Sequence, residues 1–444
     1  MPKKGGKKKG GKKGKKKTKT VAGADAIIQR LLKSYERNCA LTESVPSPWI
    51  RNALKGCLEN GTVLDKFIVE SSVVEKEGDM PVLLEPLLAA IRQERYIHIK
   101  DLRIWNYPMS HENTATLGLL LEKQCYPLRL VECMDCLMEP YSVMRFARSF
   151  RACSTLTTIS LDYNEFGDEG CKNLSKGLEG NVTILSISMC FCDLGPESGK
   201  YLGNIVSRTA VRDLFLDGNN LECEGAIDII KLCAEQADFE AFQKAEKARL
   251  KAEEEALKAE QEKEGRLRVH SAVSGGMASG SEKEDAGGDE KKKKKKKGKK
   301  KKKKKEEGPP PVGPWIRKLH LADNGIDNVA FGKEFAPIIF VRVLKKLIMG
   351  SETLEELDLD DNLIGDLSAR EIVEALEHRK EEKMEGVKLK TTHRLQAETF
   401  KNICKLGAGL KKKKKKGKKE EVFNEKEEVI SYMELNGQGQ QSII

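Results

Sequence analysis

A short apolar pattern that recurs along the chain constrains its fold more than any other feature. Its positions read apolar-x-x-apolar-x-apolar-x-x-Asn/Cys, and it is clearest in residues 156–164, 211–219 and 354–362. The early copies follow one another at 26, 31, 26 and 29 residues. We expect the closing residues of the copies to form a ladder through the molecule. The predicted ladder residues are Cys133, Asn164, Cys190, Asn219, Asn324 and Asn362.

Each position of the pattern has a physical reason. The apolar-x-apolar pair predicts a short strand whose alternate side chains point inward. The Asn or Cys side chain closes the strand by hydrogen bonding to the backbone of neighbouring turns. Apolar residues ten and fourteen positions later, such as Ile372 and Leu376 after Asn362, predict that the chain returns as a helix. Stacked copies share one core, so the sequence predicts an α/β solenoid of about eight coils.

This pattern and its period are typical of the leucine-rich repeat. Three segments resemble the ribonuclease-inhibitor class of these repeats: ISLDYNEFGDEG (159–170), LFLDGNNLECEGA (214–226) and LDLDDNLIGD (357–366). The alternation of Cys and Asn at the predicted ladder positions also resembles that class. The resemblance implies a horseshoe-shaped solenoid with its strands on the concave side.

Shifts in composition divide the chain into six parts. Residues 234–268 are rich in Ala, Glu and Lys, which favour a solvent-exposed charged helix. The predicted parts are a disordered Lys/Gly tail (1–24), a helical N-terminal region (25–94), a first block of repeats (95–235), an insertion of charged helix and lysine-rich linker (236–313), a second block of repeats (314–408) and a lysine-rich C-terminal tail (409–444).

This layout is similar to that of the family named leucine-rich repeat-containing protein 71. The resemblance rests on the opening repeat YIHIKDLRIW (96–105) and on the interruption of the repeats between LFLDGNNLECEGAIDIIKLC and WIRKLHLADNGID. Members of that family are associated with cilia and flagella. The resemblance therefore implies a ciliary or axonemal protein, and it transfers no catalytic residue.

Three lysine runs carry much of the basic charge of the chain. Residues 3–19, 291–305 and 411–419 hold 11, 14 and 8 lysines and no acidic residue. Without these 33 lysines the chain has 47 basic and 69 acidic residues, a formal charge of −22. Counterion release would drive such runs onto a polyanion. The predicted polyanion-binding residues are Lys7, Lys8, Lys9, Lys294, Lys302 and Lys413.

The identity of the polyanion stays open. The acidic tails of tubulin, an acidic lipid surface and nucleic acid all suit a polycation. The runs contain no aromatic residue, so any RNA binding would be independent of base sequence. The simplest alternative is a solvated run that only offsets the negative charge of the rest of the chain.

Several function classes lack support in the sequence. No stretch approaches 18 consecutive apolar residues, so we expect no membrane-spanning helix. The N-terminus does not resemble a secretory signal, and 12 cysteines in 444 residues favour a reducing, intracellular compartment. The six histidines are scattered, and Cys133 and Cys136 have no second pair close enough for zinc. We expect no enzyme activity, no metal and no cofactor.

The strand residues that flank the inward apolar pair predict a binding surface. We expect exposed apolar anchors of the kind that interfaces use, together with five acids on the second half of the concave face. An ordinary solvated acidic face is the alternative. The predicted partner-binding residues are Trp105, Val131, Asp213, Phe215, Asp217, Glu356, Asp358 and Asp360.

These features together predict a non-enzymatic protein-interaction scaffold of a cilium, flagellum or other microtubule-based assembly. A protein partner would bind the concave face, and the lysine runs would contact an acidic surface such as tubulin tails. Two alternatives stay open. The first is a nuclear or nucleolar RNA-associated factor that uses the same runs. The second is a ribonuclease-inhibitor-like regulator of an enzyme that uses the concave face alone.

Overall fold

In the part of the chain that the structure describes, nine parallel strands form one sheet in sequence order. The computed structural model of the protein describes residues 23–71, 80–273, 312–327, 335–392 and 394–407, with side chains of its longest helix described as far as Gln261. The three lysine runs, most of the predicted N-terminal tail and all of the predicted C-terminal tail lie outside these residues. The strands are β1 (Lys66–Glu70), β2 (Asp101–Trp105), β3 (Leu130–Met134), β4 (Thr158–Ser160), β5 (Ser186–Ser188), β6 (Asp213–Phe215), β7 (Lys318–His320), β8 (Glu356–Leu359) and β9 (Lys388–Thr391).

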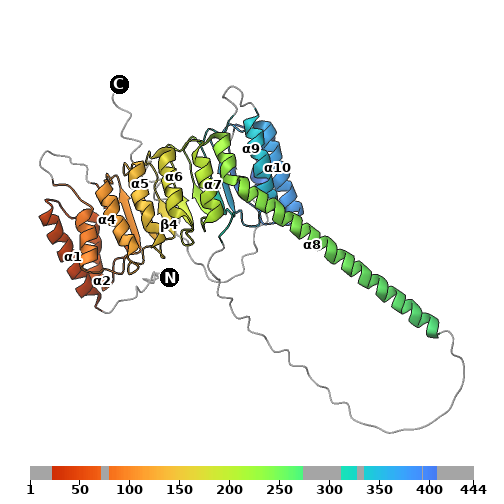
Figure 1. The fold of residues 1–444 in the computed structure, drawn as a ribbon, viewed down its shortest axis with the longest axis horizontal. Helices are drawn as coiled ribbons and strands as arrows, with labels where there is room; N and C mark the ends of the chain where they lie inside the picture. The colour runs from red at the N-terminus through yellow and green to blue at the C-terminus, as the bar shows by residue number, and fades with distance from the viewer. Residues whose placement is uncertain (1–22, 72–79, 274–311, 328–334, 393, 408–444) are drawn as a thin grey trace, which may run out of the picture.

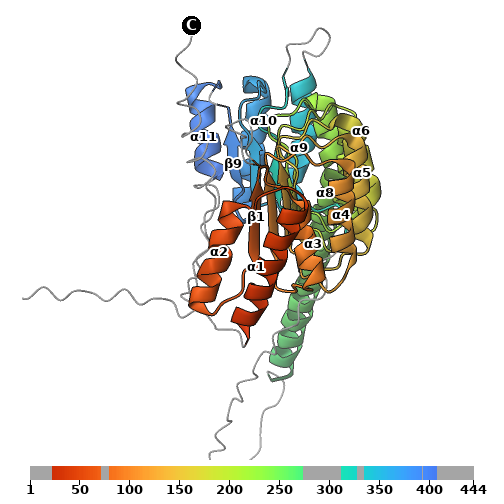
Figure 2. The same ribbon diagram turned by 90° about the vertical axis from the view of Figure 1, so that its left-hand side faces the viewer.

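A layer of helices packs against one face of the sheet. Figure 2 shows α3, α4, α5 and α6 on the same side of β1. The helices are α1 (Ala24–Leu41), α2 (Pro48–Asn60), α3 (Glu85–Gln93), α4 (His111–Glu122), α5 (Pro140–Ala147) with the 3-10 turn Arg148–Arg151, α6 (Gly167–Leu178), α7 (Ser198–Arg208), α8 (Glu222–Val273), α9 (Ala336–Gly350), α10 (Gly365–Glu381) and α11 (Ala397–Gly407).

One continuous apolar core lies between the two layers. Inward strand residues such as Leu102 and Ile104 are fully buried, and their neighbours in sequence point to the other face, as the period of two in a strand requires. Figure 1 shows α1 and α2 at one end of the stack and α9 and α10 toward the other. Short polar residues begin some helices: the Ser110 hydroxyl accepts a hydrogen bond from the Asn113 N–H at the start of α4.

Buried asparagines link successive coils at the carboxyl ends of the strands. The Asn164 amide nitrogen donates to the carbonyls of Cys133 and Leu161, both at 2.8 Å. Its Oδ1 accepts from the N–H groups of Cys136 at 3.0 Å and Met138 at 3.1 Å. Four backbone groups are thus satisfied by one side chain, which is the ladder arrangement expected from the repeat. Similar side-chain-to-carbonyl bonds are made by Asn219, Asn324 and Asn362.

The predicted ladder cysteines are wrong by three and two residues. Cys133 lies within β3 and points into the core, and Cys190 is only half-buried beyond β5. The ladder positions belong to Cys136 and Cys192. The Cys136 thiol donates to the Ile104 carbonyl at 3.3 Å, and the Cys192 thiol donates to the Leu161 carbonyl at 3.1 Å. Both segments offer two overlapping apolar registers, and the sequence pattern alone favoured the incorrect one.

The region predicted to be helical, 25–94, also contains a strand. Strand β1 pairs in parallel with β2, with Phe67 opposite Leu102 and Val69 opposite Ile104. Three consecutive apolar residues in β1 are buried. Such a short run does not show the alternation that marks a half-buried strand, and β1 therefore extends the sheet into the region where only helices were expected.

Strand β6 pairs directly with β7, although residues 216–317 separate them in the chain. The chain leaves β6 through α8, whose first part packs in the helix layer with Ile230, Cys233 and Ala237 buried. From residue 238 to 261 every residue of α8 is exposed. Figure 1 shows this part of α8 extending past the ends of α9 and α10.

Candidate partner-binding face

The face of the sheet that points away from the helix layer, here called the open face, carries rows of side chains set by the strand register. The central row contains Ile68, Arg103, Glu132, Ser160, Ser188, Phe215, His320, Asp358 and Lys390. The row on its amino-terminal side contains Lys66, Asp101, Leu130, Thr158, Ser186, Asp213, Lys318, Glu356 and Lys388.

Opposite charges alternate across the last four strands of the open face. Lys388 lies 2.6 Å from Glu356, and Lys318 lies 3.6 Å from the same carboxylate. Arg317 forms a two-pronged ion pair with Asp213 through Nε and an amino group. Side chains on neighbouring strands are only ~5 Å apart, which suits such lateral pairs. The second half of the open face is therefore a network of paired charges.

This network corrects the prediction of exposed acids. Asp213 is 6% exposed and Asp358 is 4% exposed, the latter with Lys390 at 2.6 Å. The predicted register is right at these strands, and the basic neighbours are what cover the carboxylates. Burial alone would raise the pKa of Glu356, but the hydrogen bond from Lys388 and the nearby positive charges hold it below its ordinary value.

Two predicted acids lie at the carboxyl ends of the strands and are only half-buried. The Asp217 carboxylate accepts a hydrogen bond from the Ala322 N–H at 3.0 Å. The Asp360 carboxylate accepts one from the Asp361 N–H, also at 3.0 Å. Asp217 thus links its turn to the neighbouring coil, whereas Asp360 supports its own turn.

His320 occupies the centre of this network and is absent from the predicted set. It is 1% exposed, its Nδ1 is 3.6 Å from Asp217 and its Nε2 is 3.5 Å from Glu356. Its ring meets Phe215 edge-on at 4.7 Å, so Phe215 is half-buried and not a free anchor. The sequence could have indicated His320 only through its place on a strand between β6, which Asp217 follows, and β8, which carries Glu356. That inference requires knowing which strands are adjacent in the sheet.

At the other end of the sheet, on β1 to β3, the open face carries apolar side chains beside charged ones. The Trp105 indole N–H donates to Glu132, which also lies 3.7 Å from Arg103. The predicted anchor Val131 is wrong: it is 0% exposed and points into the core. The register error at β3 reversed its direction, because a one-residue slip moves a strand residue to the opposite face.

Small hydroxyl side chains fill the middle of the open face on β4 and β5. We call Thr158, Ser160, Ser186 and Ser188 the hydroxyl strip. The Asp162 carboxylate accepts hydrogen bonds from Ser160 at 3.0 Å and from Ser188 at 2.7 Å. Burial raises the pKa of Asp162 above its ordinary value. The four residues of this strip are uncharged, and aromatic side chains lie at Trp105 on one side of it and Phe215 on the other.

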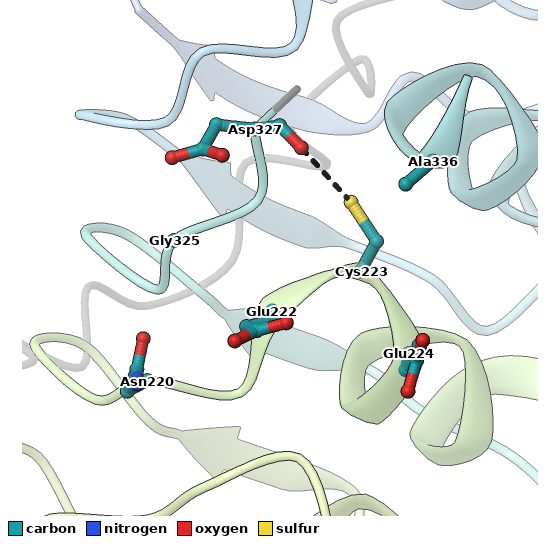
Figure 3. Close-up of a pocket in the computed structure, with 7 residues that line it drawn as sticks. All are labelled: Asn220, Glu222, Cys223, Glu224, Gly325, Asp327 and Ala336. Carbon is teal, nitrogen blue, oxygen red and sulfur yellow. Dashed lines mark hydrogen bonds between the residues drawn. The ribbon is translucent and has the colours of Figure 1, made fainter. Parts of the chain in front are cut away.

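The described residues offer little support for catalysis or metal binding. Among them, no group of three or more His, Cys, Asp or Glu side chains is arranged to hold a metal ion. A cavity of about 110 Å³ at the start of α8 is too small for most ligands. Figure 3 shows its acidic lining and the Cys223 thiol 3.8 Å from the Asp327 carbonyl. A search of the described helices for a bilayer-spanning apolar stretch finds none.

The predicted polyanion-binding lysines lie outside the described residues, so their placement stays a prediction. These residues are Lys7, Lys8, Lys9, Lys294, Lys302 and Lys413.

Comparison with known families agrees with the parallel sheet and the asparagine ladder. Residues 152–175 and 350–373 each match the family described as Leucine Rich repeat. The chain contains leucine-rich repeats. The two matched segments cover β4 with the start of α6, and β8 with the start of α10. A search of curated proteins finds no match to the chain.

Proposed function

We propose that the protein is a non-enzymatic scaffold that binds a protein partner on the open face of its sheet. The observation that supports this proposal is the hydroxyl strip flanked by Trp105 and Phe215, a broad surface of half-buried side chains. Repeat solenoids use such extended surfaces for partner binding. The paired charges on β6 to β9 would contribute orientation and specificity more than net attraction.

We infer a horseshoe of the ribonuclease-inhibitor class, interrupted by the insertion at 236–313; the sequence predicts about eight coils, and the described residues form nine strands. This layout resembles the family of leucine-rich repeat-containing protein 71, and we propose a ciliary, flagellar or other microtubule-based location on that ground. Fluorescent tagging in a ciliated cell tests the location, and an exclusively nuclear signal would contradict it.

The experiment for the open face places a large charge on the hydroxyl strip. Ser186→Arg changes an outward, half-buried position without touching the core, and Asn204→Arg on the exposed side of α7 is the matched control. The wild-type chain should capture a protein partner from a lysate of ciliated cells, identified by mass spectrometry. We expect the Ser186→Arg variant to capture at least tenfold less of the partner than the wild type, and the Asn204→Arg variant to capture as much as the wild type. Equal capture by both variants would contradict the proposed face.

The lysine runs are proposed to contact an acidic surface, with the tubulin tails as the leading candidate. Co-sedimentation with microtubules tests this, with and without removal of the tails. Neutralising residues 3–19, 291–305 and 411–419 should weaken binding and flatten the slope of log affinity against log salt. Binding that survives the loss of all three runs would contradict this part of the proposal.

Two alternatives would use the same features. A nuclear or nucleolar RNA-associated factor would use the lysine runs, and RNA would then replace microtubules in the binding assay. A regulator of an enzyme would use the open face alone, and neutralising the runs would then leave partner capture unchanged.

A further inference from the structure

A groove opens where α8 leaves the body of the protein. The Gly350 Cα lies so close to α8 that an added Cβ would be 2.5 Å from the Ala237 carbonyl oxygen. Beyond this contact α8 is exposed and extends past α9 and α10 (Figure 1). The space between the three helices has a volume of about 960 Å³. This is at the upper end of the range for ligand sites, and its open form suits a chain segment better than a small molecule.

Apolar and charged side chains together line the groove. The apolar ones are Phe242 and the small residues Ala241, Ala245 and Ala248 on α8, with Met349 and Met384 across from them. The charged ones include acids such as Asp238 and Glu371 beside the bases Lys345 and Lys346. Phe242 is 66% exposed, which is costly for a large aromatic side chain without a partner. Alanines spaced by four and three share one helix face and permit close approach of a second helix. The groove therefore resembles the grooves that accept amphipathic helices.

The position where the chain leaves the described structure points to an occupant. Helix α11 ends at Gly407, and an added Cβ there would lie 3.3 Å from the Val387 carbonyl oxygen. Val387 is three residues after Met384, a distance of at most ~11 Å along the chain. The remaining 37 residues, 408–444, thus begin beside the wall of the groove. A tethered segment reaches an effective concentration in the millimolar range.

The sequence of this remainder supplies a suitable segment at 421–435, EVFNEKEEVISYMEL. Val422, Val429 and Met433 are separated by seven and four residues, and Phe423 and Ile430 by seven, which is the spacing of one helix face. Val422 is 15 residues beyond Gly407 and can reach up to ~50 Å from it. The basic side chains that line the groove on α9 are already paired with acids of α8 and α10, as Lys346 is with Asp238 and Lys345 with Glu371, so the segment matches the groove through its apolar side chains and its tether.

We propose that residues 421–435 dock as an amphipathic helix in the groove between α8, α9 and α10 of the same chain. The apolar side chains of the segment would cover Phe242 and the three alanines. The lysine run at 411–419 lies between Gly407 and this segment, so docking would hold that run close to the body. This inference is independent of what the open face binds.

Photo-cross-linking in the full chain tests the contact directly. A benzophenone amino acid replaces Ile430 on the apolar side of the segment, and Glu428 on the polar side as the matched control. We expect cross-links from position 430 to residues 238–248, 342–352 or 378–384 of the same chain, and far fewer from position 428. Cross-links to a second copy, to other regions, or equally from both positions would overturn the proposal.

A competition experiment tests occupancy of the groove. The probe is a labelled synthetic peptide of residues 420–436, followed by fluorescence anisotropy. The full chain with Val429→Asp and Ile430→Asp should bind this peptide at least tenfold more tightly than the wild type, whose own segment occupies the groove. Adding Ala245→Glu should abolish binding, whereas Leu250→Glu, exposed on α8 but outside the groove, should not. Equal binding by wild type and variant, or no binding by either, would overturn the proposal.

Discussion

At the scale of single residues, lateral partners decide the chemistry of the open face. Asp213 and Asp358 belong to the predicted acidic surface, but each carboxylate is paired with a basic side chain from the neighbouring coil. Desolvated carboxylates of this kind stabilise the sheet only while their partners remain. The paired acids therefore act on stability more than on partner attraction.

Loss of one such partner should be measurable. Asp213→Asn leaves Arg317 without its carboxylate, and we expect the free energy of unfolding to fall by about 1–2 kcal/mol, because the arginine retains access to water. Asp193→Asn on an exposed turn is the control and should stay within ~0.5 kcal/mol of the wild type. Chemical denaturation followed by circular dichroism measures both. Equal stability of the two variants would contradict the ion-pair network.

The lowered pKa of Glu356 predicts a pH dependence of stability. A carboxyl whose pKa is lowered by folding stabilises the native state above its ordinary pKa and loses this contribution as pH falls through the folded-state value. The stability difference between wild type and Glu356→Gln should thus be largest at neutral pH and shrink below the ordinary value of 4.5. In a Lys388→Met background the pH dependence should be smaller, because Lys388 supplies the main stabilising contact. A difference that does not change with pH would contradict this.

The asparagine ladder predicts that substitutions of Asn164 lower stability by different amounts. Asn164→Ala would leave two buried N–H groups and two buried carbonyls without their partner, and we expect a loss of more than ~3 kcal/mol in the free energy of unfolding. Asn164→Cys should cost less, since Cys136 and Cys192 fill the same position and donate to a carbonyl. Thermal and chemical unfolding rank the variants. A cysteine variant as unstable as the alanine variant would contradict the assignment.

At the scale of elements, close contact between helices α8 and α9 helps to hold strands β1 to β6 and strands β7 to β9 in one sheet. Helix α8 packs against α9 where Gly350 meets Ala237, and this contact lies beside the pairing of β6 with β7. No sequence pattern marks this contact, because it joins residues separated by more than a hundred positions. The exposed part of α8 begins at the next residue, Asp238.

This contact can be tested against a matched glycine. Gly350→Ala places a methyl group 2.5 Å from a backbone oxygen, and we expect a loss of about 1–3 kcal/mol through overpacking. Gly56→Ala in the interior of α2 meets no atom within 4 Å and should stabilise the protein by about 0.5–1 kcal/mol through helix propensity. Differential scanning calorimetry gives the shift for each. Equal shifts would show that α8 does not pack on α9 as described.

At the scale of the whole molecule, the repeat pattern predicts more of the fold than of the binding face. Where Asn closes a copy, as at Asn164, Asn219 and Asn362, the strand register follows directly from the sequence. Where Cys closes it, overlapping apolar residues allow two registers, and Val131 was assigned to the wrong face. The hydroxyl strip, the ion pairs and His320 depend on which strands are adjacent, which single copies of a repeat do not reveal.

One sheet runs without a break from β6 to β7. Backbone hydrogen bonds join the two sides, including Leu216 N–H to the His320 carbonyl at 3.0 Å and Arg317 N–H to the Arg212 carbonyl at 2.8 Å. Because of these bonds, the open face continues from β6 to β7 although residues 216–317, which include α8, separate the two strands in the chain. Without them the chain would form two shorter sheets, each with an exposed apolar end.

Amide hydrogen exchange of the full chain, read by mass spectrometry, tests this claim most directly. If the sheet is continuous, amides in 213–218 and 317–322 should exchange as slowly as those of the interior strands β4 and β5, and should lose protection together as denaturant is added. If β6 and β7 belonged to separate sheets, each would be an edge strand, and the amides that bond between them, such as those of Leu216 and Arg317, would lack partners. Fast exchange at 213–218 and 317–322, or separate loss of protection on the two sides, would contradict the account.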